Sequence, residues 1–204
     1  ALAVLNRVNP ALSHVQTLIL CPTRELADQV ASEVRRLAQR LPNTRVLTLC
    51  GGRSKRLQVK DIERGCQIVV GTPGRVLHHL NEATLCLRRA KSVVLDEADR
   101  MLDMGFSEDV TRIVNRAPKE RQTLLFSATF PDEIKHLSAD IQKAASHVSV
   151  VSPGSAPTTL RQRVIRCAVS ERFDVLVDLL AHYRPDTVLV FCETRDDCAN
   201  TAKE

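Results

Sequence analysis

The sequence contains no apolar run of the roughly 18 residues that a membrane-spanning helix needs. Its first residues also lack the order of basic, apolar and small residues that marks a secretory signal peptide. Charged residues make up 26% of the chain and hydrophobic residues 44%, a balance typical of a folded globular protein rather than a disordered one. We therefore expect a cytoplasmic protein that contacts no membrane.

The seven cysteines form no Cys-x-x-Cys pair and no Cys/His cluster at the spacing of a zinc site. Several of them lie inside apolar stretches, which favours reduced thiols in the protein core. We expect neither disulfide bonds nor a zinc site.

Short apolar segments rich in β-branched residues alternate with helical segments along most of the chain. We expect strands at residues 17–21, 46–49, 68–71, 92–96, 123–127 and 148–151. These segments are apolar throughout, as in strands that are covered on both faces of a parallel sheet. The order predicts an α/β fold with a doubly wound parallel sheet, whose ligand-binding loops follow the carboxyl ends of the strands.

A segment rich in proline, glycine and serine divides the chain. We interpret residues 152–160 as a linker between a first domain at residues 1–151 and a second at residues 161–204. The first domain is expected to be truncated at its N-terminus, because the first residue is Ala and residues 1–8 resemble the end of a helix with no strand before it.

The second domain is predicted to contain two β-like segments, at residues 162–167 and 187–191. A helical segment at residues 171–183 lies between them, with its apolar residues Val175, Leu176, Leu179 and Leu180 facing inward. A sheet of two strands leaves its apolar face uncovered. We therefore expect this domain to be truncated too.

Basic residues concentrate between Pro22 and Arg75, where the sequence has eleven Lys and Arg residues and five acidic residues. The net charge of the whole chain is +5, so this segment accounts for all of the excess. A local basic excess is what binding to the phosphates of a nucleic acid requires. A solvated surface explains the same charges, and charge alone does not choose between the two.

The segment Ser92-Val-Val-Leu-Asp-Glu-Ala-Asp99 places two acids at the end of an apolar strand. The carboxylates of Asp96 and Glu97 could hold Mg²⁺ and polarise a water molecule. Taken alone, acids at a strand end are also explained by an ordinary polar turn or a helix cap.

Asp96-Glu-Ala-Asp99, followed by Arg-Met-Leu-Asp-Met-Gly-Phe106, resembles the signature of the DEAD-box RNA helicases. The resemblance implies a RecA-like fold for both domains, with ATP and Mg²⁺ as cofactors. It implies that Asp96 binds Mg²⁺ through water, and that Glu97 orients the attacking water. Asp99 would couple the nucleotide site to the other domain. Such phosphoryl transfer depends on positioning and electrostatics and needs no covalent intermediate.

Three further segments resemble family motifs that bind the backbone of one RNA strand. Each follows an expected strand in the basic segment, although each alone is explained by a helix start, a turn or a loop. The implied RNA-binding residues are Pro22, Thr23, Arg24, Glu25, Gly51, Gly52, Thr72, Pro73, Gly74 and Arg75. Contacts to phosphates and 2′-hydroxyls would select RNA without reading its sequence.

Ser127, Ala128 and Thr129 follow the fifth expected strand and fit the family motif that couples ATP turnover to strand separation. A hydroxyl-rich cap is the alternative explanation for these residues.

A Val-Phe-Cys-Glu-Thr segment in the second domain resembles the first motif of the family's second motor domain. The resemblance implies that Phe191 is buried in a strand and that Glu193 and Thr194 contact RNA. This is the least specific of the matches.

Within the family, the segments Leu-Cys-Pro-Thr-Arg-Glu-Leu-Ala and His-Tyr-Arg-Pro look most like the bacterial DbpA type. That type is associated with ribosomal RNA and with assembly of the large ribosomal subunit. The resemblance therefore implies ribosomal RNA as the partner, and we expect a monomer.

No stretch of the sequence matches the phosphate-binding pattern Gly-x-x-x-x-Gly-Lys-Ser/Thr, and no glycine precedes Gly51. The family's adenine-reading glutamine motif and its arginine motif for the γ-phosphate are not found either. Loss of such an arginine costs on the order of 10³ to 10⁵ in rate. We therefore expect a fragment of an ATP-dependent RNA helicase that is inactive by itself. A non-catalytic RNA-binding RecA-like module is the alternative.

Overall fold

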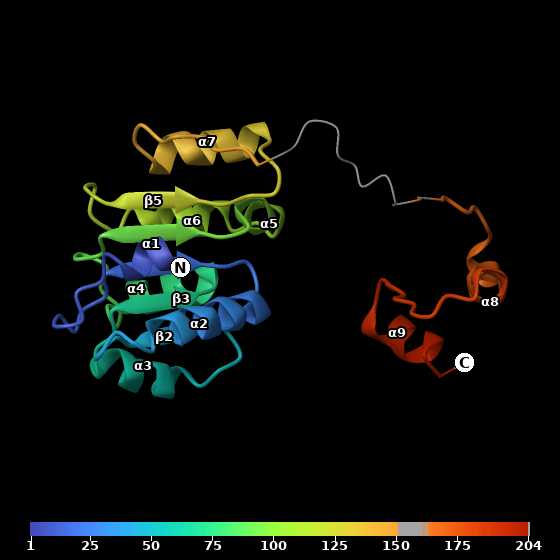
Figure 1. Cartoon of the computed structure of the whole chain (residues 1–204), viewed down its shortest axis with the longest axis horizontal. Helices are drawn as coiled ribbons and strands as arrows, with labels where there is room; N and C mark the ends of the chain where they lie inside the picture. Colours follow the sequence, from blue (N-terminus) through green and yellow to red (C-terminus); the bar gives the residue numbers. More distant parts are fainter. Residues whose placement is uncertain (151–160, 162, 204) are drawn as a thin grey trace. The chain divides into compact units, whose positions relative to one another are not determined.

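The computed structural model describes residues 1–150, 161 and 163–203. The chain divides into two compact units, unit 1 at Ala1–His147 and unit 2 at Val148–Glu204 (Figure 1). The predicted linker at residues 152–160 lies outside the described residues. None of the helices in the described residues has the length and hydrophobicity of a membrane span.

Unit 1 is built on a parallel sheet of five strands. They are β1 (Thr17–Leu20), β2 (Val46–Leu49), β3 (Ile68–Gly71), β4 (Ser92–Leu95) and β5 (Gln122–Leu125). Their spatial order is β2-β3-β1-β4-β5, and every neighbouring pair is parallel. Strands β2 and β3 therefore lie on one side of β1, with β2 at the edge of the sheet, and β4 and β5 lie on the other side. The predicted α/β fold with a doubly wound parallel sheet is confirmed.

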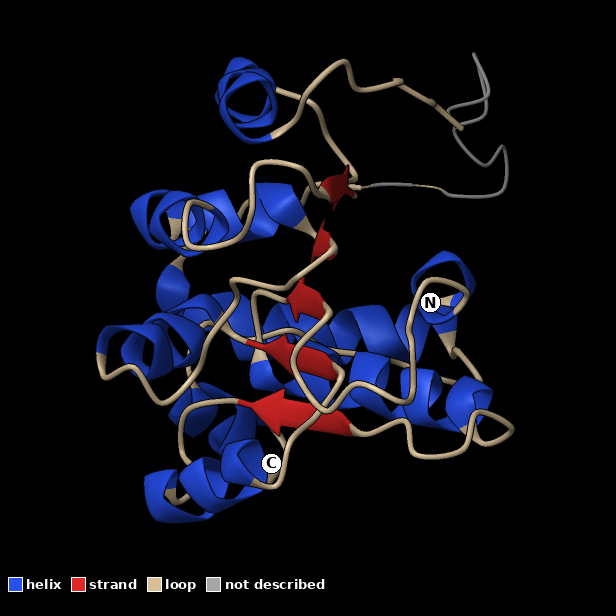
Figure 2. Cartoon of the chain, turned by 90° about the vertical axis from the view of Figure 1, so that its left-hand side faces the viewer, coloured by secondary structure: helices blue, strands red, loops and turns tan. Residues whose placement is uncertain are grey.

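Helices cover both faces of this sheet (Figure 2). They are α1 (Leu2–Leu5), α2 (Arg24–Ala38), α3 (Lys55–Glu63), α4 (Pro73–Asn81), α5 (Ala98–Asp103), α6 (Ser107–Val114) and α7 (Asp132–Ile141). Buried side chains of α1 and α2 pack on one face, and those of α4, α5, α6 and α7 pack on the other.

Alternation of side chains along β1 shows why the strands are mostly apolar. Leu18 and Leu20 belong to the core on the side of α4, whereas Ile19 and Cys21 belong to the core on the side of α2. Successive side chains of a strand point to opposite faces, so each face needs its own apolar set. Both sets are buried here.

Helix α2 buries a face that differs slightly from the one its leucines suggest. The apolar residues Leu26, Val30, Val34, Leu37 and Leu41 recur at helical spacing in the sequence and predict the inward face, but the buried residues of α2 are Ala27, Ala31, Val34 and Ala38. The larger side chains of Leu26, Val30 and Leu37 are partly buried beside them. Small residues at the centre of the contact let the helix axis approach the sheet closely, with longer side chains flanking it.

Unit 2 contains a short 3₁₀ helix (Val169–Glu171), α8 (Arg172–Tyr183) and α9 (Arg195–Thr201). The predicted helix at residues 171–183 is therefore confirmed. Its expected inward residues, Val175, Leu176, Leu179 and Leu180, are only partly buried.

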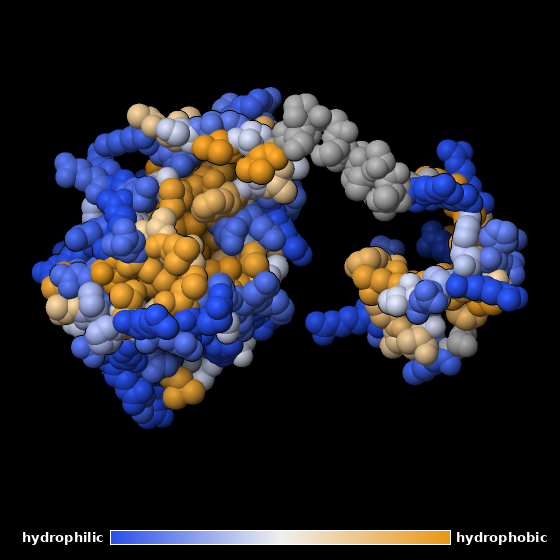
Figure 3. All heavy atoms as spheres, viewed as in Figure 1, coloured by the Kyte–Doolittle hydropathy of each residue, from blue (hydrophilic) through white to orange (hydrophobic). Residues whose placement is uncertain are grey.

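Three predicted strands are wrong within the described residues. Residues 148–150, 163–167 and 187–191 form no strand. Phe191, expected to be buried in a strand, is 87% exposed, and apolar side chains lie open on unit 2 (Figure 3). A strand requires a hydrogen-bonded neighbour, and an apolar sequence alone does not provide one.

The thiols separate into two chemical classes. Burial raises the pKa of Cys21 to about 12 and that of Cys66 to about 11. Cys50 is also buried, whereas Cys86, Cys167 and Cys198 are exposed and Cys192 is partly exposed. The expected location in the core therefore holds for three of the seven cysteines.

Because the thiolate is the nucleophile, iodoacetamide is expected to label the exposed cysteines of the native protein first. Labelling of Cys21, Cys50 and Cys66 should require a denaturant. Mass spectrometry of tryptic peptides taken at successive times measures the labelling rates of the exposed and of the buried cysteines. Native labelling of Cys21 as fast as Cys86 would contradict the packing described above.

Candidate functional site

The candidate residues of unit 1 lie in the loops that leave the carboxyl ends of its five strands. The strand ends are in register: Leu20 pairs with Gly71 and Leu95, Leu49 pairs with Gly71, and Leu95 pairs with Leu125. Since the strands are parallel, the loops that follow all emerge at one edge of the sheet. The structure thereby gathers segments spread over more than half of the chain.

Asp96 lies directly after β4, where its main-chain N–H donates a hydrogen bond of 2.9 Å to the carbonyl of Leu20. Burial raises the pKa of the Asp96 carboxyl. The N–H of Glu97 lowers this pKa, and the negative charge of Glu97 raises it again; the net shift is upward. A nearby cation would stabilise the charged form of a carboxylate in such surroundings.

Glu97 has a backbone conformation that is rare for a residue with a side chain. Its φ is 50° and its ψ is 55°, in the left-handed region, and it immediately precedes α5. Such a conformation costs on the order of 1–3 kcal/mol and is concentrated at functional sites. The side chain lies 3.6 Å from the Arg100 guanidinium in an exposed ion pair. This backbone conformation sets the direction in which the Glu97 side chain extends from the end of β4.

Asp99 joins the segment after β4 to the segment after β5. Its carboxylate Oδ2 accepts hydrogen bonds of 2.9 Å from both the main-chain N–H and the hydroxyl of Thr129. Its own N–H donates to the Ser127 hydroxyl over 3.2 Å. Ala128 lies exposed between these two residues. We call these contacts the Asp99 bridge.

The pKa of Asp99 reflects this bridge. Burial alone raises it, but hydrogen bonds from Thr129, from the N–H of Arg100 and from Ser127 lower it further than burial raises it. Asp99 therefore favours its charged form in the folded protein. The sequence suggested a role in coupling the nucleotide site to another domain; the contact that the structure shows lies within unit 1.

The predicted RNA-binding residues after β1 and β2 are brought together. Thr23 caps α2, since its hydroxyl accepts a hydrogen bond of 3.2 Å from the N–H of Leu26. Arg24 donates to the carbonyl of Gly51 over 3.4 Å. Gly52 has φ of 75°, and a side chain there would collide with the Arg24 guanidinium. Pro22 is buried and Glu25 is exposed on the first turn.

The segment after β3 begins helix α4 beside this turn. The N–H of Thr72 donates a hydrogen bond of 3.1 Å to the carbonyl of Leu49. Pro73 occupies the first turn of the helix, where its missing N–H is no loss. A shallow pocket is lined by Gly51, Thr72, Gly74, Arg75, His78 and Phe106.

Two lining residues of this pocket, His78 and Phe106, were missed by the sequence reasoning. His78 is one helical turn beyond Arg75, so the i, i+3 rule could have placed it on the same face. Phe106 closes the DEAD-box signature, but no signal in the sequence placed it next to α4.

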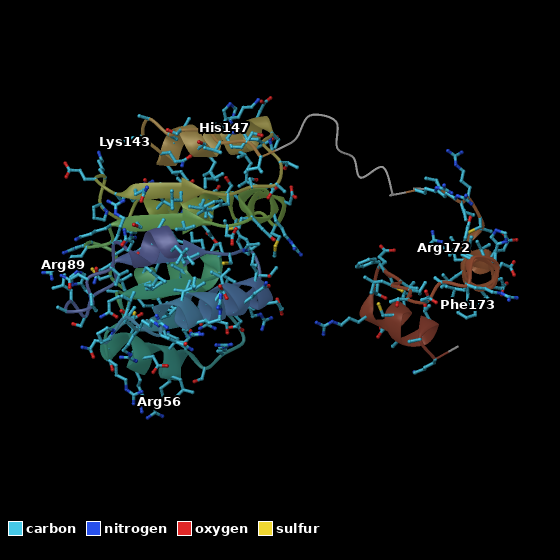
Figure 4. All side chains as sticks on the ribbon, in the orientation of Figure 1. Arg56, Arg89, Lys143, His147, Arg172 and Phe173 are labelled. Carbon is cyan, nitrogen blue, oxygen red and sulfur yellow. The ribbon has the colours of Figure 1, made fainter. Side chains whose placement is uncertain are left out.

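The basic residues between Pro22 and Arg75 fall into two groups. Several of them form exposed ion pairs, including Arg53 with Asp28 at 2.7 Å and Arg36 with Glu33. Such surface pairs contribute little to stability. Arg56 projects from α3 into solvent (Figure 4). A solvated surface therefore explains part of the charge, while Arg24 and Arg75 lie at the loop edge.

In unit 2, Thr194 begins helix α9. Its hydroxyl accepts a hydrogen bond of 3.0 Å from the N–H of Asp197, and Thr194 donates back to that carboxylate from its main chain and its hydroxyl. The predicted RNA-binding residue Thr194 thus forms a capping box. Glu193 beside it is exposed.

Comparison with known proteins identifies relatives along nearly all of the chain. "ATP-dependent RNA helicase DbpA" of Escherichia coli is 43% identical over 197 residues, which are 97% of this chain and 43% of the relative. "ATP-dependent RNA helicase CshA" of Listeria monocytogenes is 39% identical over 95% of this chain and 37% of the relative. The chain thus spans less than half of the length of these curated relatives.

Two solved structures also match the chain. A DEAD box protein from Methanococcus jannaschii matches with a TM-score of 0.68 and 38% identity, over 98% of this chain and 53% of that one. A hypothetical ATP-dependent RNA helicase from Sulfolobus tokodaii matches with a TM-score of 0.61 and 35% identity, over 65% of this chain and 39% of that one. Residues 1–137 match the family described as DEAD/DEAH box helicase. The chain therefore belongs to the DEAD/DEAH box helicase family.

Proposed function

We propose that the chain forms the RNA-binding and water-activating part of an ATP-dependent RNA helicase. The observation that carries this proposal is the Asp99 bridge. It ties the segment bearing Asp96 and Glu97 to the segment bearing Ser127 and Thr129, at the sheet edge where the basic loops also emerge. A change at the nucleotide can thus reach a neighbouring loop through direct hydrogen bonds.

The carboxylates fit a magnesium site that is completed by the nucleotide. The described residues contain no group of three or more His, Cys, Asp or Glu that could hold a metal by itself. Mg²⁺ commonly takes one or two carboxylates together with water and substrate phosphates. Asp96, whose pKa is raised by burial, would hold the ion through water. When bound, Mg²⁺ neutralises charge on the phosphates.

Glu97 is assigned to the attacking water. Glu97 follows Asp96 directly at the end of β4. Its carboxylate forms an exposed ion pair with Arg100 and is accessible to solvent. A carboxylate that accepts a hydrogen bond from water aligns the water and takes up its proton. Positioning of this kind is the protein's main contribution to phosphoryl transfer.

Backbone recognition of RNA is assigned to the loops after β1, β2 and β3. Arg24 and Arg75 supply charge, and the Gly51-Gly52 turn lets a sugar-phosphate chain approach the protein main chain. The names of the relatives support RNA as the substrate. Ribosomal RNA, a monomeric state and a cytoplasmic location stay predictions, based on the resemblance to the DbpA type and on composition.

A chimera tests this proposal. The 197 matched residues would replace the corresponding segment of the Escherichia coli DbpA protein, and circular dichroism would show that the chimera is folded. We expect ATP turnover that rises on addition of RNA, measured as phosphate release beside the parent protein. A folded chimera that neither binds RNA nor hydrolyses ATP would overturn the proposal.

A non-catalytic RNA-binding module is the second candidate. It would bind RNA through the same loops after β1, β2 and β3 but would not hydrolyse ATP. The chimera distinguishes the two candidates, because the parent protein supplies the residues outside the matched segment. RNA binding without RNA-stimulated ATP turnover would favour the module.

A further inference from the structure

A fully buried histidine connects two of the candidate RNA-binding segments. His79 lies on α4 with no exposed surface, and Gln58 lies on α3 with 4% of its surface exposed. The imidazole Nε2 of His79 is 3.0 Å from the side-chain Oε1 of Gln58. The amide Nε2 of Gln58 donates a hydrogen bond of 2.9 Å to the carbonyl of Cys50. Cys50 immediately precedes the Gly51-Gly52 turn.

The bonding pattern determines which groups donate. Because the Gln58 amide donates to Cys50, its oxygen is left to accept, so the proton on the His79 ring must lie on Nε2. The other ring nitrogen, Nδ1, is 2.9 Å from the Thr84 hydroxyl, which also lies 3.1 Å from the carbonyl of His79. Burial lowers the pKa of His79, consistent with a neutral ring.

Gln58 thereby sets the orientation of the peptide between Cys50 and Gly51. The C=O and N–H of a trans peptide point in opposite directions. Since the Cys50 carbonyl points toward Gln58, the N–H of Gly51 points away from it. On the other side of the turn, Arg24 donates to the carbonyl of Gly51. Two side chains therefore hold two successive peptides of the turn.

The other end of the connection is α4, the helix that begins at the Thr72-Pro-Gly-Arg75 segment. His79 lies in the last turn of this helix, so its bond to Gln58 ties the helix to α3 and, through α3, to the Gly51-Gly52 turn. Gly51 of the turn and Thr72, Gly74 and Arg75 at the start of α4 line the same shallow pocket. A buried network with every member satisfied is rigid and specifies a single arrangement.

We propose that Gln58 and His79 are positioning residues that hold the turn after β2 in a fixed orientation relative to α4, so that both contact one RNA backbone. The inference rests on the proposed RNA binding and deepens it. Neither side chain touches RNA. Their removal weakens binding because the turn then samples orientations that point its N–H groups elsewhere.

We call the connection from His79 through Gln58 to the Cys50 carbonyl the relay. Four variants of the 204-residue chain test it. Gln58→Met keeps the length of the side chain and removes both of its hydrogen bonds. His79→Leu removes the donor to Gln58, whereas His79→Gln keeps an N–H that reaches it. Gln67→Met is the matched control, because Gln67 is equally buried and also makes two side-chain hydrogen bonds. Its partners are main-chain groups of Leu12 and Arg45, at the opposite ends of the strands.

Fluorescence anisotropy with a labelled single-stranded oligouridine measures RNA affinity at one salt concentration, and urea unfolding shows that each variant is folded. We expect Gln58→Met and His79→Leu to weaken binding by about tenfold, the loss expected for one positioning hydrogen bond. Gln67→Met should lower stability comparably but leave the affinity within about twofold, and His79→Gln should recover most of the loss.

The amide resonances of Gly51 and Gly52 in ¹⁵N-labelled protein test the relay without RNA. They should shift in Gln58→Met and stay in place in Gln67→Met. If the unmodified chain binds no RNA, the proposed RNA binding fails, while shifted resonances still show that the relay orients the turn. Unchanged glycine resonances in Gln58→Met, or equal affinity losses in Gln58→Met and Gln67→Met, overturn the relay.

Discussion

Replacing Glu97 by glutamine in the DbpA chimera is expected to lower RNA-stimulated ATP turnover by about 10²- to 10⁴-fold, the usual contribution of a positioned general base. The amide has nearly the shape of the carboxylate, so the left-handed backbone at this position is undisturbed. What it loses is the ability to accept a proton from water. Phosphate release at saturating ATP and RNA measures the effect.

RNA affinity of this variant should be unchanged, because Glu97 lies after β4 and the proposed RNA-binding loops follow β1, β2 and β3. Glu108→Gln is a suitable control. Glu108 is an exposed carboxylate at the start of α6, paired with Arg112 over 3.0 Å, and its replacement should leave turnover as it was. Turnover by Glu97→Gln within about threefold of the unmodified chimera would remove Glu97 from the role of general base.

The sheet could be predicted from the sequence because strands covered on both faces are mostly apolar and do not alternate regularly between apolar and polar residues. All five strands of unit 1 begin and end within two residues of the predicted bounds. The same rule was wrong at residues 187–191, which are equally apolar but form no strand. An apolar composition indicates that a segment is suited to burial in a sheet. Whether it forms a strand depends on a neighbouring strand with which it can pair.

The positions of the candidate residues in the fold were predictable, but the hydrogen bonds between them were not. Asp96 and Thr23 could be located because acids and hydroxyls after an apolar strand must lie at the loop edge. The hydrogen bonds from Thr129 to Asp99 and from His79 to Gln58 join residues 30 and 21 positions apart. Such pairs depend on how the helices and loops pack against one another around the sheet. Local sequence patterns carry no information about that packing.

These connections also explain why single motifs were ambiguous. Thr23 is a helix cap and also a proposed RNA-binding residue, and Thr194 is both as well. A capping hydroxyl orders the first turn of its helix, and the remaining free N–H groups of that turn then point toward a ligand. The structural and functional explanations of these residues are therefore compatible.

Breaking the Asp99 bridge is expected to separate ATP turnover from duplex unwinding. In the chimera, Thr129→Val removes the hydroxyl that donates to Asp99 while keeping the shape of the side chain, and Ser127→Ala removes the acceptor for the Asp99 N–H. The carboxylates of Asp96 and Glu97 are untouched. We expect the double variant to unwind a short RNA duplex about tenfold more slowly, within the range of coupling energies between sites.

ATP turnover of the same variant should stay within about threefold, since the groups assigned to Mg²⁺ and water are retained. Thr129→Ser, which keeps the hydroxyl, should restore most of the unwinding rate. Thr111→Ala is the matched control, because the Thr111 hydroxyl bonds only its own helix at the carbonyl of Ser107. Parallel losses of turnover and unwinding would mean that the bridge supports the catalytic carboxylates themselves. Loss of unwinding alone requires that the bridge transmits the state of the nucleotide site to the loop after β5.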